Sequence, residues 1–309
     1  MPDNTSVTDA PDSRKAVVST PRKFFLLVIV SILLLVAVLI NQRQVRKNIN
    51  TISGTSPQRN FWLLCHAGVT DEERKTAFLE LLKAGNMEWR SANLKGLDLS
   101  DLDMPRSQVE NANFENSSMA GARFSNCEFS FSQFQLVDFT DADLSSSNLI
   151  EIYLLKAIMN NADFNNTNLR RAMIEQVTAH NANFENADLS EAHLLLADLT
   201  DSNFKNTDMS LVNLEAATLQ GCNLDSANLE GALLLDTDFT DSNWWQARGL
   251  SSDALDNLLR SFPPSEKIKP AWEDDFKQWL TEFTTAKQEV NTENPAPLPE
   301  PKPEPDPES

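Results

Sequence analysis

The chain has 309 residues, a formal net charge of −19 and an isoelectric point near 4.5. Binding of a nucleic-acid backbone needs Lys and Arg to displace counterions, so we expect no direct nucleic-acid binding. A hydrophobic content of 41% is enough to bury a core in one or two domains. The three cysteines, Cys65, Cys127 and Cys222, have no close spacing, so they predict neither a disulfide framework nor a zinc site.

The first predicted element is an apolar segment at residues 24–40. Its sequence is FFLLVIVSILLLVAVLI, in which Ser31 is the one polar residue. As a helix it would be about 26 Å long, at the short end of what spans a bilayer. A cleaved signal peptide is the competing interpretation, but residues 41–50 offer no small-x-small cleavage site. A buried globular helix is disfavoured because the segment is apolar on every face. We therefore expect a disordered tail at residues 1–23 and an uncleaved transmembrane anchor.

Basic residues around the anchor do not fix its orientation. Arg14, Lys15, Arg22 and Lys23 precede it, and they are balanced by Arg43, Arg46, Lys47 and Arg59 after it. The positive-inside count is a tie. Following the usual habit of N-terminal signal anchors, we expect a single-pass protein of the inner cell membrane with its repeat domain on the non-cytoplasmic side.

A polar linker, residues 41–69, and an N-terminal capping helix, residues 70–90, are predicted next. Thr70 can cap a helix, with Glu73 three residues later completing a capping box. Gly85 lies where a left-handed helix stop belongs. The pattern predicts one helix over residues 71–84.

Two helices are predicted after residue 250. LSSDALDNLLRSFPP indicates a helix that begins at Ser251 or Ser252 and stops before Pro263. A second helix is indicated by apolar residues at helical spacing, namely Trp272, Phe276, Trp279, Leu280 and Phe283. We assign residues 251–285 to C-terminal capping helices and residues 286–309 to an extended Pro-rich tail.

Between these helices an apolar residue recurs at every fifth position. The register runs unbroken from Leu94 to Trp244 through 31 positions, of which 14 are Leu and 9 are Phe. The residue two before each centre is Ala, Ser, Thr, Cys or Val in 28 of 31 cases, and neither set contains a charge. A helix would carry this set around every face, and a straight strand would alternate it between two faces. The chain must therefore turn once per repeat.

The turn positions have a characteristic amino-acid composition. Gly, Asn or Asp occupies 17 of the 30 positions that lie two after a centre, and these residues tolerate the dihedral angles of turns. Two inward residues separated by one outward residue fit a short extended piece. A right-angle bend after each piece winds a square coil of four repeats per turn, stacked at roughly 4.8 Å.

The segment ANFENADLSEAHLLLADLTDSNF, residues 182–204, resembles the pentapeptide repeat family, whose motif is A(D/N)LxX. The resemblance covers the 31 repeats, about half of the chain. It implies a mainly β fold, a right-handed quadrilateral β-helix, which we place at residues 91–250 between α-helical caps. Some members of the family are acidic rods that resemble B-form DNA and occupy the DNA site of a type II topoisomerase.

Residues at steps of 20 would stack on one face of such a coil. Outward positions then give an apolar stripe of two columns, the first with Tyr153, Met173 and Leu233 and the second with Leu155, Leu195 and Leu235, flanked by Leu136 and Leu196. An exposed stripe of this length is unusual on a soluble monomer. We expect it to be covered, either by residues 272–283 folding back or by a partner chain.

Candidate catalytic groups are few. His66, His180 and His193 lie in no ligand spacing, and Cys127 and Cys222 replace the small inward residue, as core thiols do. The sequence therefore predicts no enzyme, no cofactor and no metal site.

Residues 91–250 hold 24 Asp and Glu against 8 Lys and Arg. Such charge on a solenoid can simply keep it soluble. We predict a non-catalytic, membrane-anchored scaffold or protein-binding module that presents an acidic β-helix surface. Its partner would be an unknown protein or a second copy, bound through the repeat surface or the C-terminal helices. The alternative is a DNA-mimic inhibitor or protector of a type II topoisomerase.

Overall fold

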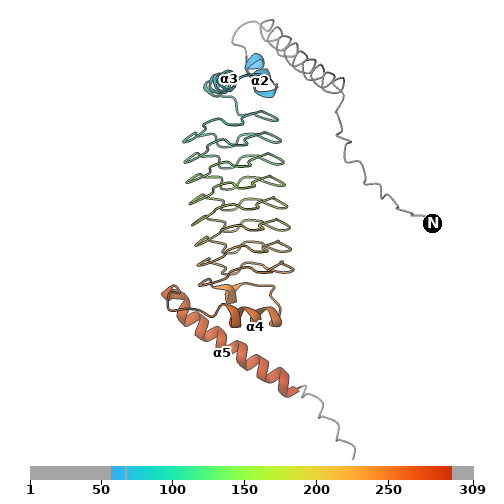
Figure 1. The fold of residues 1–309 in the computed structure, drawn as a ribbon, viewed down its shortest axis with the longest axis vertical. Coiled ribbons are helices and arrows are strands. Elements are labelled where there is room, and N and C mark those ends of the chain that lie inside the picture. The colour runs from blue at the N-terminus through green and yellow to red at the C-terminus, as the bar shows by residue number, and fades with distance from the viewer. Residues whose placement is uncertain (1–56, 67, 294–309) are drawn as a thin grey trace, which may run out of the picture. The chain divides into compact units, whose positions relative to one another are not determined.

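The computed structural model describes residues 57–66 and 68–293. The expected N-terminal tail, the anchor at residues 24–40, the linker up to residue 56 and the tail from residue 294 lie outside these described residues. In chain order the elements are α2 (Pro57–Cys65), α3 (Asp71–Lys83), the short η1 (Trp244–Gln246), α4 (Ser252–Ser261) and α5 (Pro270–Glu293). Between α3 and η1 the chain winds as a stack of coils (Figure 1).

Each turn of the coil takes 20 residues. Parallel β-bridges join residues 20 apart and recur every five residues, from Glu88↔Gln108 to Thr218↔Asp238, followed by Asn228↔Arg248. Four repeats therefore complete one turn, as the spacing predicts. The expected β content is present as isolated bridges and not as extended strands in the described residues, because the chain bends after every bridge.

Each side of a coil pairs with the next coil through three backbone hydrogen bonds, one of which lies at the corner, as from the N–H of Asn186 to the carbonyl of Lys205 at 3.0 Å. Around Phe184, its N–H donates to the carbonyl of Asn203 at 2.7 Å, and the N–H of Asn203 donates to Ala182 at 2.9 Å. The pattern repeats along the stack. These bonds satisfy the backbone groups that the coil buries.

The corners are tight turns with one left-handed residue. The N–H of Ala187 donates to the carbonyl of Phe184 at 3.0 Å, and Asn186, between them, has φ of 58°. Every fifth residue from Ser91 to Asp241 likewise has φ between 53° and 69°. Positive φ at the third residue of a turn favours Gly and Asn, which explains the composition of these positions.

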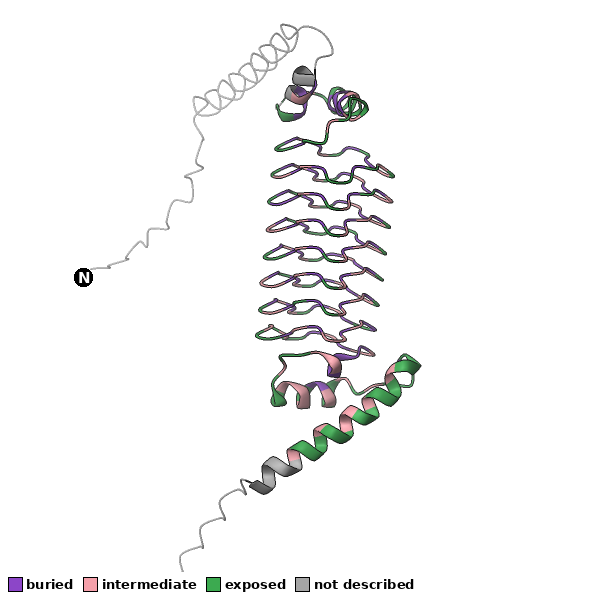
Figure 2. Ribbon diagram, turned by 180° about the vertical axis from the view of Figure 1, so that it is seen from behind, coloured by how far each residue is buried: buried purple, intermediate pink, exposed green. Residues whose placement is uncertain are grey.

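The inward positions form one continuous core (Figure 2). Every centre from Leu94 to Trp244 is buried except Leu234, which is half-buried in the last coil, where the chain leaves the stack. Small inward residues with hydroxyls are satisfied by the backbone, as when Thr207 Oγ1 donates to the carbonyl of Phe184 at 2.7 Å. This lets a polar side chain occupy the core without an unpaired donor.

Helix α3 begins as predicted. The Oγ1 of Thr70 accepts from the N–H of Glu73 at 3.2 Å, and Glu73 Oε2 accepts from the N–H of Thr70 at 2.9 Å. The capping box is thus confirmed, and the helix ends at Lys83, one residue before the predicted end.

Helix α3 closes the first coil from above. The ring of Phe78 packs against that of Trp89 with centroids 4.7 Å apart, and both side chains are buried. Arg74 Nη1 donates to the carbonyl of Asn93 at 3.0 Å. The open edge of the stack is therefore covered, as an edge with unpaired backbone groups requires.

Helix α2 corrects the expected linker. Residues 57–65 are helical, Leu63 and Leu64 are buried, and the carbonyl of Leu64 accepts from the N–H of Asn93 at 2.7 Å. Asn60 Nδ2 donates to Glu80 Oε2 at 2.7 Å and so ties α2 to α3. The linker interpretation overlooked the short apolar run FWLLC, from which Leu63 and Leu64 are buried.

Helix α4 follows the predicted signals at the other end. Ser251 Oγ accepts from the N–H of Ala254 at 3.2 Å, and the helix stops two residues before Pro263. Trp244 Nε1 donates to the carbonyl of Phe262 at 3.0 Å. The last coil is thereby joined to the chain that leaves α4.

Helix α5 is longer than predicted. It extends to Glu293, through residues assigned to the Pro-rich tail, because AKQEVNTE contains no proline and continues the helix. No helix within residues 57–66 and 68–293 has the length and apolar character needed to cross a membrane.

Candidate functional site

One side of the coil carries most of the exposed apolar side chains. Bridges stack Gln133, Tyr153, Met173, His193, Asn213 and Leu233 in a single column along its middle. We call this side, with its two flanking corners, the apolar face. Its exposed large apolar residues are Phe131, Leu136, Tyr153, Leu155, Leu196, Leu211, Leu233 and Leu235.

The structure brings the predicted stripe residues together on this face. Tyr153 and Met173 are bridged directly, and Leu233 lies three coils further along the same column. Leu235 is 66% exposed and Leu196 is 52% exposed, whereas Met173 and Leu195 are half-buried. The stacking at steps of 20 and the outward positions therefore follow the sequence pattern. A binding role for the stripe stays a prediction.

Three exposed residues of this region were not predicted from the sequence. Phe131 and Leu211 lie on the corner of the face that precedes its middle column. Ile158 lies beyond the corner that follows this column. Leu211 is 62% exposed. For Phe131 and Leu211, the signal that could have found them is the same step of 20, applied to the corner that precedes the middle column.

The expected internal cover for the stripe is wrong. Instead of folding back, residues 272–283 pack at the end of the coil, where Phe276 lies 4.8 Å from Trp245 and Trp279 lies 5.4 Å from Trp244, measured between ring centroids. The aromatic side of α5 thus finds its apolar surface at the end of the core. None of the described residues covers Leu235 or Leu211, which remain among the most exposed apolar side chains.

The corners of the apolar face differ from the other corners of the coil. On the two opposite corners, 14 of the 15 left-handed residues are Asn, Asp, Gly or Ser, with Arg106 as the exception. On the corners of the apolar face, all ten left-handed residues from 131 to 216 are of other types, namely Phe131, Leu136, Glu151, Lys156, Arg171, Gln176, Glu191, Leu196, Leu211 and Ala216. A left-handed φ destabilises a non-glycine residue by roughly 1–2 kcal/mol, and Asn and Asp are destabilised least. This face therefore carries residues that its turns disfavour.

A second folding device is also missing from four coils of this face, although Asn213 retains it. At most outward positions Asp or Asn accepts the N–H of the residue two ahead, as Asp188 Oδ1 does from Ser190 at 2.9 Å. Along the apolar face this acceptor is replaced in four successive coils by Gln133, Tyr153, Met173 and His193. Strain and lost turn contacts gathered at one place point to a role other than folding.

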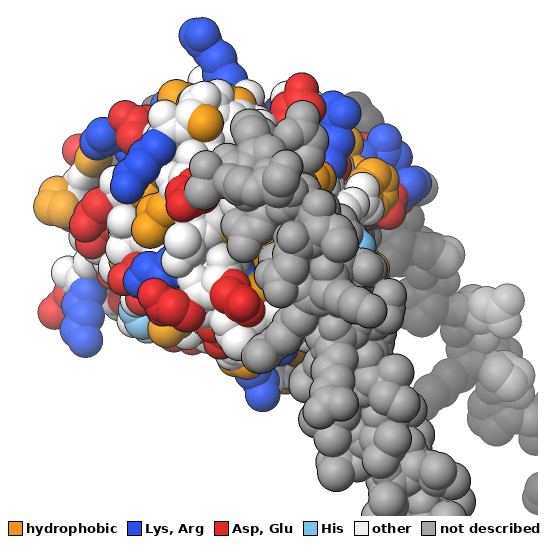
Figure 3. Space-filling model, turned by 90° about the horizontal axis from the view of Figure 1, so that it is seen from above, with side chains coloured by type: hydrophobic (Ala, Val, Ile, Leu, Met, Phe, Trp, Pro, Cys, Tyr) orange, Lys and Arg blue, Asp and Glu red, His pale blue; other side chains and the backbone are white. Residues whose placement is uncertain are grey.

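Charged side chains at the border of the apolar face form ion pairs with one another. Glu191 accepts from Arg171 Nε at 2.7 Å and from Arg170 Nη2 at 2.5 Å, and hydrogen bonds from Arg171 and Arg170 lower the pKa of Glu191. Arg171 also lies 3.8 Å from Glu151. Seen from the α2–α3 end, acidic and basic side chains are interspersed with apolar ones (Figure 3). The border of the face is thus not uniformly acidic.

Much of the acidic charge of the coil has a local use. Eight aspartates accept a backbone N–H two residues ahead: Asp98, Asp138, Asp143, Asp163, Asp188, Asp198, Asp208 and Asp238. Five more hold left-handed corners: Asp101, Asp141, Asp201, Asp236 and Asp241. Thirteen of the 24 acidic residues therefore stand where the turns favour Asp or Asn.

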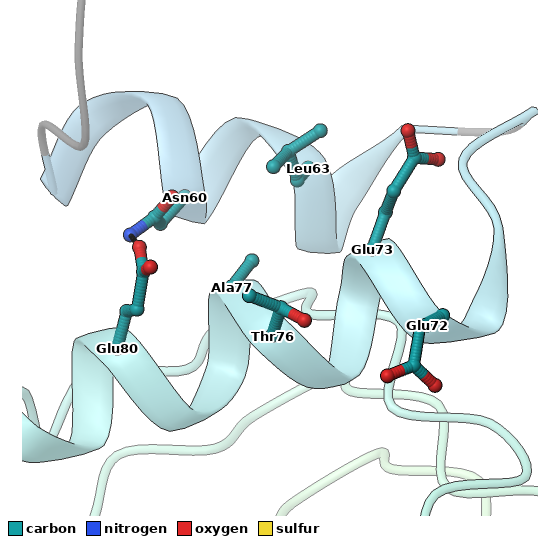
Figure 4. Close-up of a pocket in the computed structure, with 7 residues that line it drawn as sticks. All are labelled: Asn60, Leu63, Glu72, Glu73, Thr76, Ala77 and Glu80. Atoms are coloured by element: carbon teal, nitrogen blue, oxygen red, sulfur yellow. Dashed lines mark hydrogen bonds between the residues drawn. The ribbon is translucent and has the colours of Figure 1, made fainter.

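A hollow of about 170 Å³ lies between α2 and α3 (Figure 4). Glu72, Glu73 and Glu80 line it together with Asn60, Leu63, Thr76 and Ala77. Asn60 already binds Glu80, and Glu73 completes the helix cap. Within the described residues no group of three or more His, Cys, Asp and Glu side chains is arranged to hold a metal ion.

The two cysteines of the repeat coil are enclosed in its core. Cys127 and Cys222 are buried, and their thiols donate to the carbonyls of Met104 at 3.2 Å and Leu199 at 3.0 Å. Burial raises the pKa of Cys127 to about 11. His180 Nε2 lies 2.8 Å from Asp198 Oδ2 on the surface of the coil. A thiol held protonated inside a packed core is unsuited to nucleophilic attack.

The model of a protein family, pentapeptide repeats, matches the coil in eight copies, over residues 107–145, 138–173, 180–215 and 207–246. The matched segments are pentapeptide repeats. Proteins of this family fold as right-handed quadrilateral β-helices and are generally non-catalytic structural or binding proteins, and no enzyme family is indicated. The family resemblance and the four-sided coil inferred from the spacing are thus supported.

Solved structures similar to the repeat coil include HetL, a pentapeptide repeat protein involved in heterocyst differentiation regulation in the cyanobacterium Nostoc sp. strain PCC 7120. HetL is 21% identical, with 54% of this chain and 95% of that chain covered and a TM-score of 0.27. A trypsin-treated variant of QnrB1, a plasmid-mediated fluoroquinolone resistance protein, is 18% identical, covering 61% and 95%, with a TM-score of 0.36.

Rfr23, a pentapeptide repeat protein from the cyanobacterium Cyanothece 51142, is 19% identical, covering 40% of this chain and 93% of that chain, with a TM-score of 0.28. No curated protein matches the chain. At these identities and TM-scores, nothing that the three proteins do transfers to this one.

Proposed function

We propose that this chain is a non-catalytic, membrane-anchored scaffold whose apolar face binds a protein. The observation that carries the proposal is the change of residue type at the ten corner positions from 131 to 216. Turns that elsewhere use mostly Asn, Asp, Gly and Ser here hold residues of other types, four of which are exposed Phe or Leu. Exposed aromatic and aliphatic side chains contribute binding energy when a partner removes them from water.

A crosslinking experiment tests the binding role. A photoreactive residue at Leu155 on the apolar face is compared with one at Asn165, which has the same place in its repeat on the opposite side of the coil. We expect adducts in intact cells from position 155 and none from position 165. Equal adduct formation at both positions, or none at either, would overturn the proposed binding role of this face.

The membrane part of the proposal rests on the sequence of residues 24–40 and on the missing cleavage site. It places the repeats on the non-cytoplasmic side of the inner membrane. Reporter fusions after Ser309 that are active on one side alone test the orientation. Removal of residues 24–40 should move the chain from the membrane fraction to the soluble fraction, and a chain that already fractionates as soluble would contradict the anchor.

A DNA-mimic inhibitor or protector of a type II topoisomerase is the second candidate. The observation in its favour is the excess of 24 acidic over 8 basic residues in residues 91–250. It ranks second because thirteen of these carboxylates stand at turn positions, so the fold itself accounts for about half of the acidic residues. A cytoplasmic coil that inhibits supercoiling in a purified gyrase assay would reverse this order.

A further inference from the structure

We propose that the apolar face binds a second copy of this chain, with the two coils parallel and related by a twofold axis along the coil direction. The inference rests on the proposed function, because it names the partner of the same face. Most soluble oligomers are symmetric, and a twofold interface presents one patch to itself. The patch must therefore complement itself, and its residues can be tested for that property.

The face is long enough to align two coils. Its middle column runs from Gln133 to Leu233 through five coil intervals, about 24 Å at the usual strand spacing. Tyr153 and Leu233 are exposed along this column, and Leu235 is exposed on the corner beside it. Aromatic residues and Met are enriched in the buried centre of protein interfaces, and this column supplies both.

In the parallel arrangement, each residue of the middle column faces its own copy. Tyr153 meets Tyr153, Met173 meets Met173, and Leu233 meets Leu233. The corner before the middle column of one copy then opposes, at the same height, the corner after the middle column of the other copy. Phe131 faces Leu136 in this way, so apolar side chains meet along the middle and at the first corner.

The same symmetry pairs opposite charges. Glu151 on one corner faces Lys156 of the second copy, and Arg171 faces Gln176, with Glu175 beside it on the same corner. Symmetry makes each pair occur twice. Complementary charges at the border of an interface fix its register and disfavour wrong partners.

An antiparallel arrangement fits less well, because it sets each column against itself in reverse order. The register that opposes Leu155 and Leu195 brings Glu151 against Glu191. The register that opposes Leu155 and Leu235 brings Glu175 against Glu215. The register between these two avoids like charges, but it puts the apolar side chains of the middle column against polar ones. The pairs are then Tyr153 with Asn213, Met173 with His193 and Leu233 with Gln133.

The parallel geometry has a direct test in the full-length chain, kept in mild detergent and carrying Cys65→Ser. Tyr153→Cys places a thiol on the proposed axis, and Arg123→Cys places one at the same repeat position on the opposite side. A disulfide needs Cα atoms about 4.4–6.8 Å apart, whereas sheets that pack face to face lie about 10 Å apart, so a short bis-maleimide joins the two thiols instead. After this treatment we expect a covalent dimer as the main species for Tyr153→Cys and a monomer for Arg123→Cys.

A charge exchange tests the register. Glu151→Lys alone and Lys156→Glu alone each oppose like charges, and we expect each to weaken the dimer by about threefold to tenfold, the scale of a surface ion pair. The double variant restores opposite charges and should return the dissociation constant toward that of the unaltered chain. Sedimentation measures the constants, and circular dichroism confirms folding, because Glu151 also lies 3.8 Å from Arg171 within the chain.

A monomer at all accessible concentrations would overturn the inference, as would a dimer that does not crosslink at position 153. In-cell crosslinking at Leu155 separates this failure from that of the proposed function. An adduct of twice the chain mass supports the dimer. An adduct of another mass leaves the binding function in place and removes the second copy as partner. No adduct, together with a monomer in solution, removes both.

Discussion

Phe184 and Phe204 occupy the same place in successive coils, and their rings stack with centroids 5.0 Å apart and an interplanar angle of 3°. Phe164 continues the stack on the other side of Phe184 at 5.1 Å. All three side chains are fully buried. Each large centre therefore packs mainly on the coils directly above and below it, which makes neighbouring coils depend on one another.

Phe184→Ala should remove about 3–5 kcal/mol from the free energy of unfolding, because a buried ring is lost and a cavity remains between two coils. Phe184→Leu keeps most of the volume, is a residue that other centres use, and should cost under about 1.5 kcal/mol. Urea denaturation followed by circular dichroism measures both. If the two variants lost equal stability, ring stacking and not volume would be the dominant contribution.

Leu196→Asn should raise stability by about 1 kcal/mol, because Leu196 is exposed and has φ of 58°, and Asn adopts this conformation at lower cost. The matched control is Asn206→Leu, at φ of 57° on the opposite side, which should lose a similar amount. Denaturation under monomeric conditions measures both. A loss of stability in Leu196→Asn would show that this leucine serves folding, and it would weaken the argument for the apolar face.

Much of the fold follows from the sequence, because the five-residue register fixes which side chains point inward and where the chain bends. The capping box at Thr70 and the stop before Pro263 are equally local signals, and the structure agrees with both. Helix α2 was missed because its nine residues are short and only their burial against α3 and the first coil makes them helical.

The candidate site could be predicted only in part. Steps of 20 group Tyr153, Leu155 and Leu235, since stacking follows from the repeat number per turn. The strain at Phe131 and Leu211 could not be predicted, because left-handed φ at every corner is a property of the closed coil and overrides the preference of the individual residue. The packing site of α5 could not be predicted either, because the spacing of its aromatic residues does not say which apolar surface they contact.

One cysteine should react in the folded chain and three in the unfolded chain. Cys65 is exposed, although partial burial raises its pKa, whereas Cys127 and Cys222 are buried with raised pKa values. Titration with a chromogenic disulfide near pH 8, with and without denaturant, measures the counts. Cys65→Ser should abolish the native reaction. A second thiol that reacts rapidly in the folded chain would indicate that the coil opens locally.

Asp225 should make stability depend on pH in the acidic range. A hydrogen bond from Lys205, whose Nζ lies 2.8 Å from Asp225 Oδ2, lowers the pKa of Asp225. A carboxyl whose pKa is lower in the folded state stabilises the fold above its unfolded pKa, and this contribution is lost as pH falls through the folded pKa. Asp225→Asn should therefore cost about 0.2–1 kcal/mol at neutral pH and nothing near pH 2.

The measurement for Asp225 is denaturation of both chains across that pH range. Lys205→Met, which removes the same pair from the other side, should flatten the pH dependence in the same way. A cost for Asp225→Asn that stays constant down to pH 2 would assign its effect to the hydrogen bond from Ser226 Oγ, which is 2.9 Å long, and not to the charge.

Asp275 should be the residue that holds α5 on the end of the coil. Its Oδ2 accepts from Trp245 Nε1 at 2.7 Å and from Gln246 Nε2 at 2.7 Å, and Trp245 is buried. Asp275→Ala leaves the indole N–H of Trp245 without its acceptor, which costs roughly 1–3 kcal/mol. We expect faster hydrogen exchange in α5 and faster trypsin cleavage after Lys277, with the repeat coil unchanged. Asp274→Ala is the matched control, because its side chain is 98% exposed, 3.5 Å from Lys277. If the two variants exchanged at the same rate, other contacts of α5, namely the aromatic contacts of Phe276 and Trp279 and the ion pair of Lys287 with Asp256, would hold the helix in place.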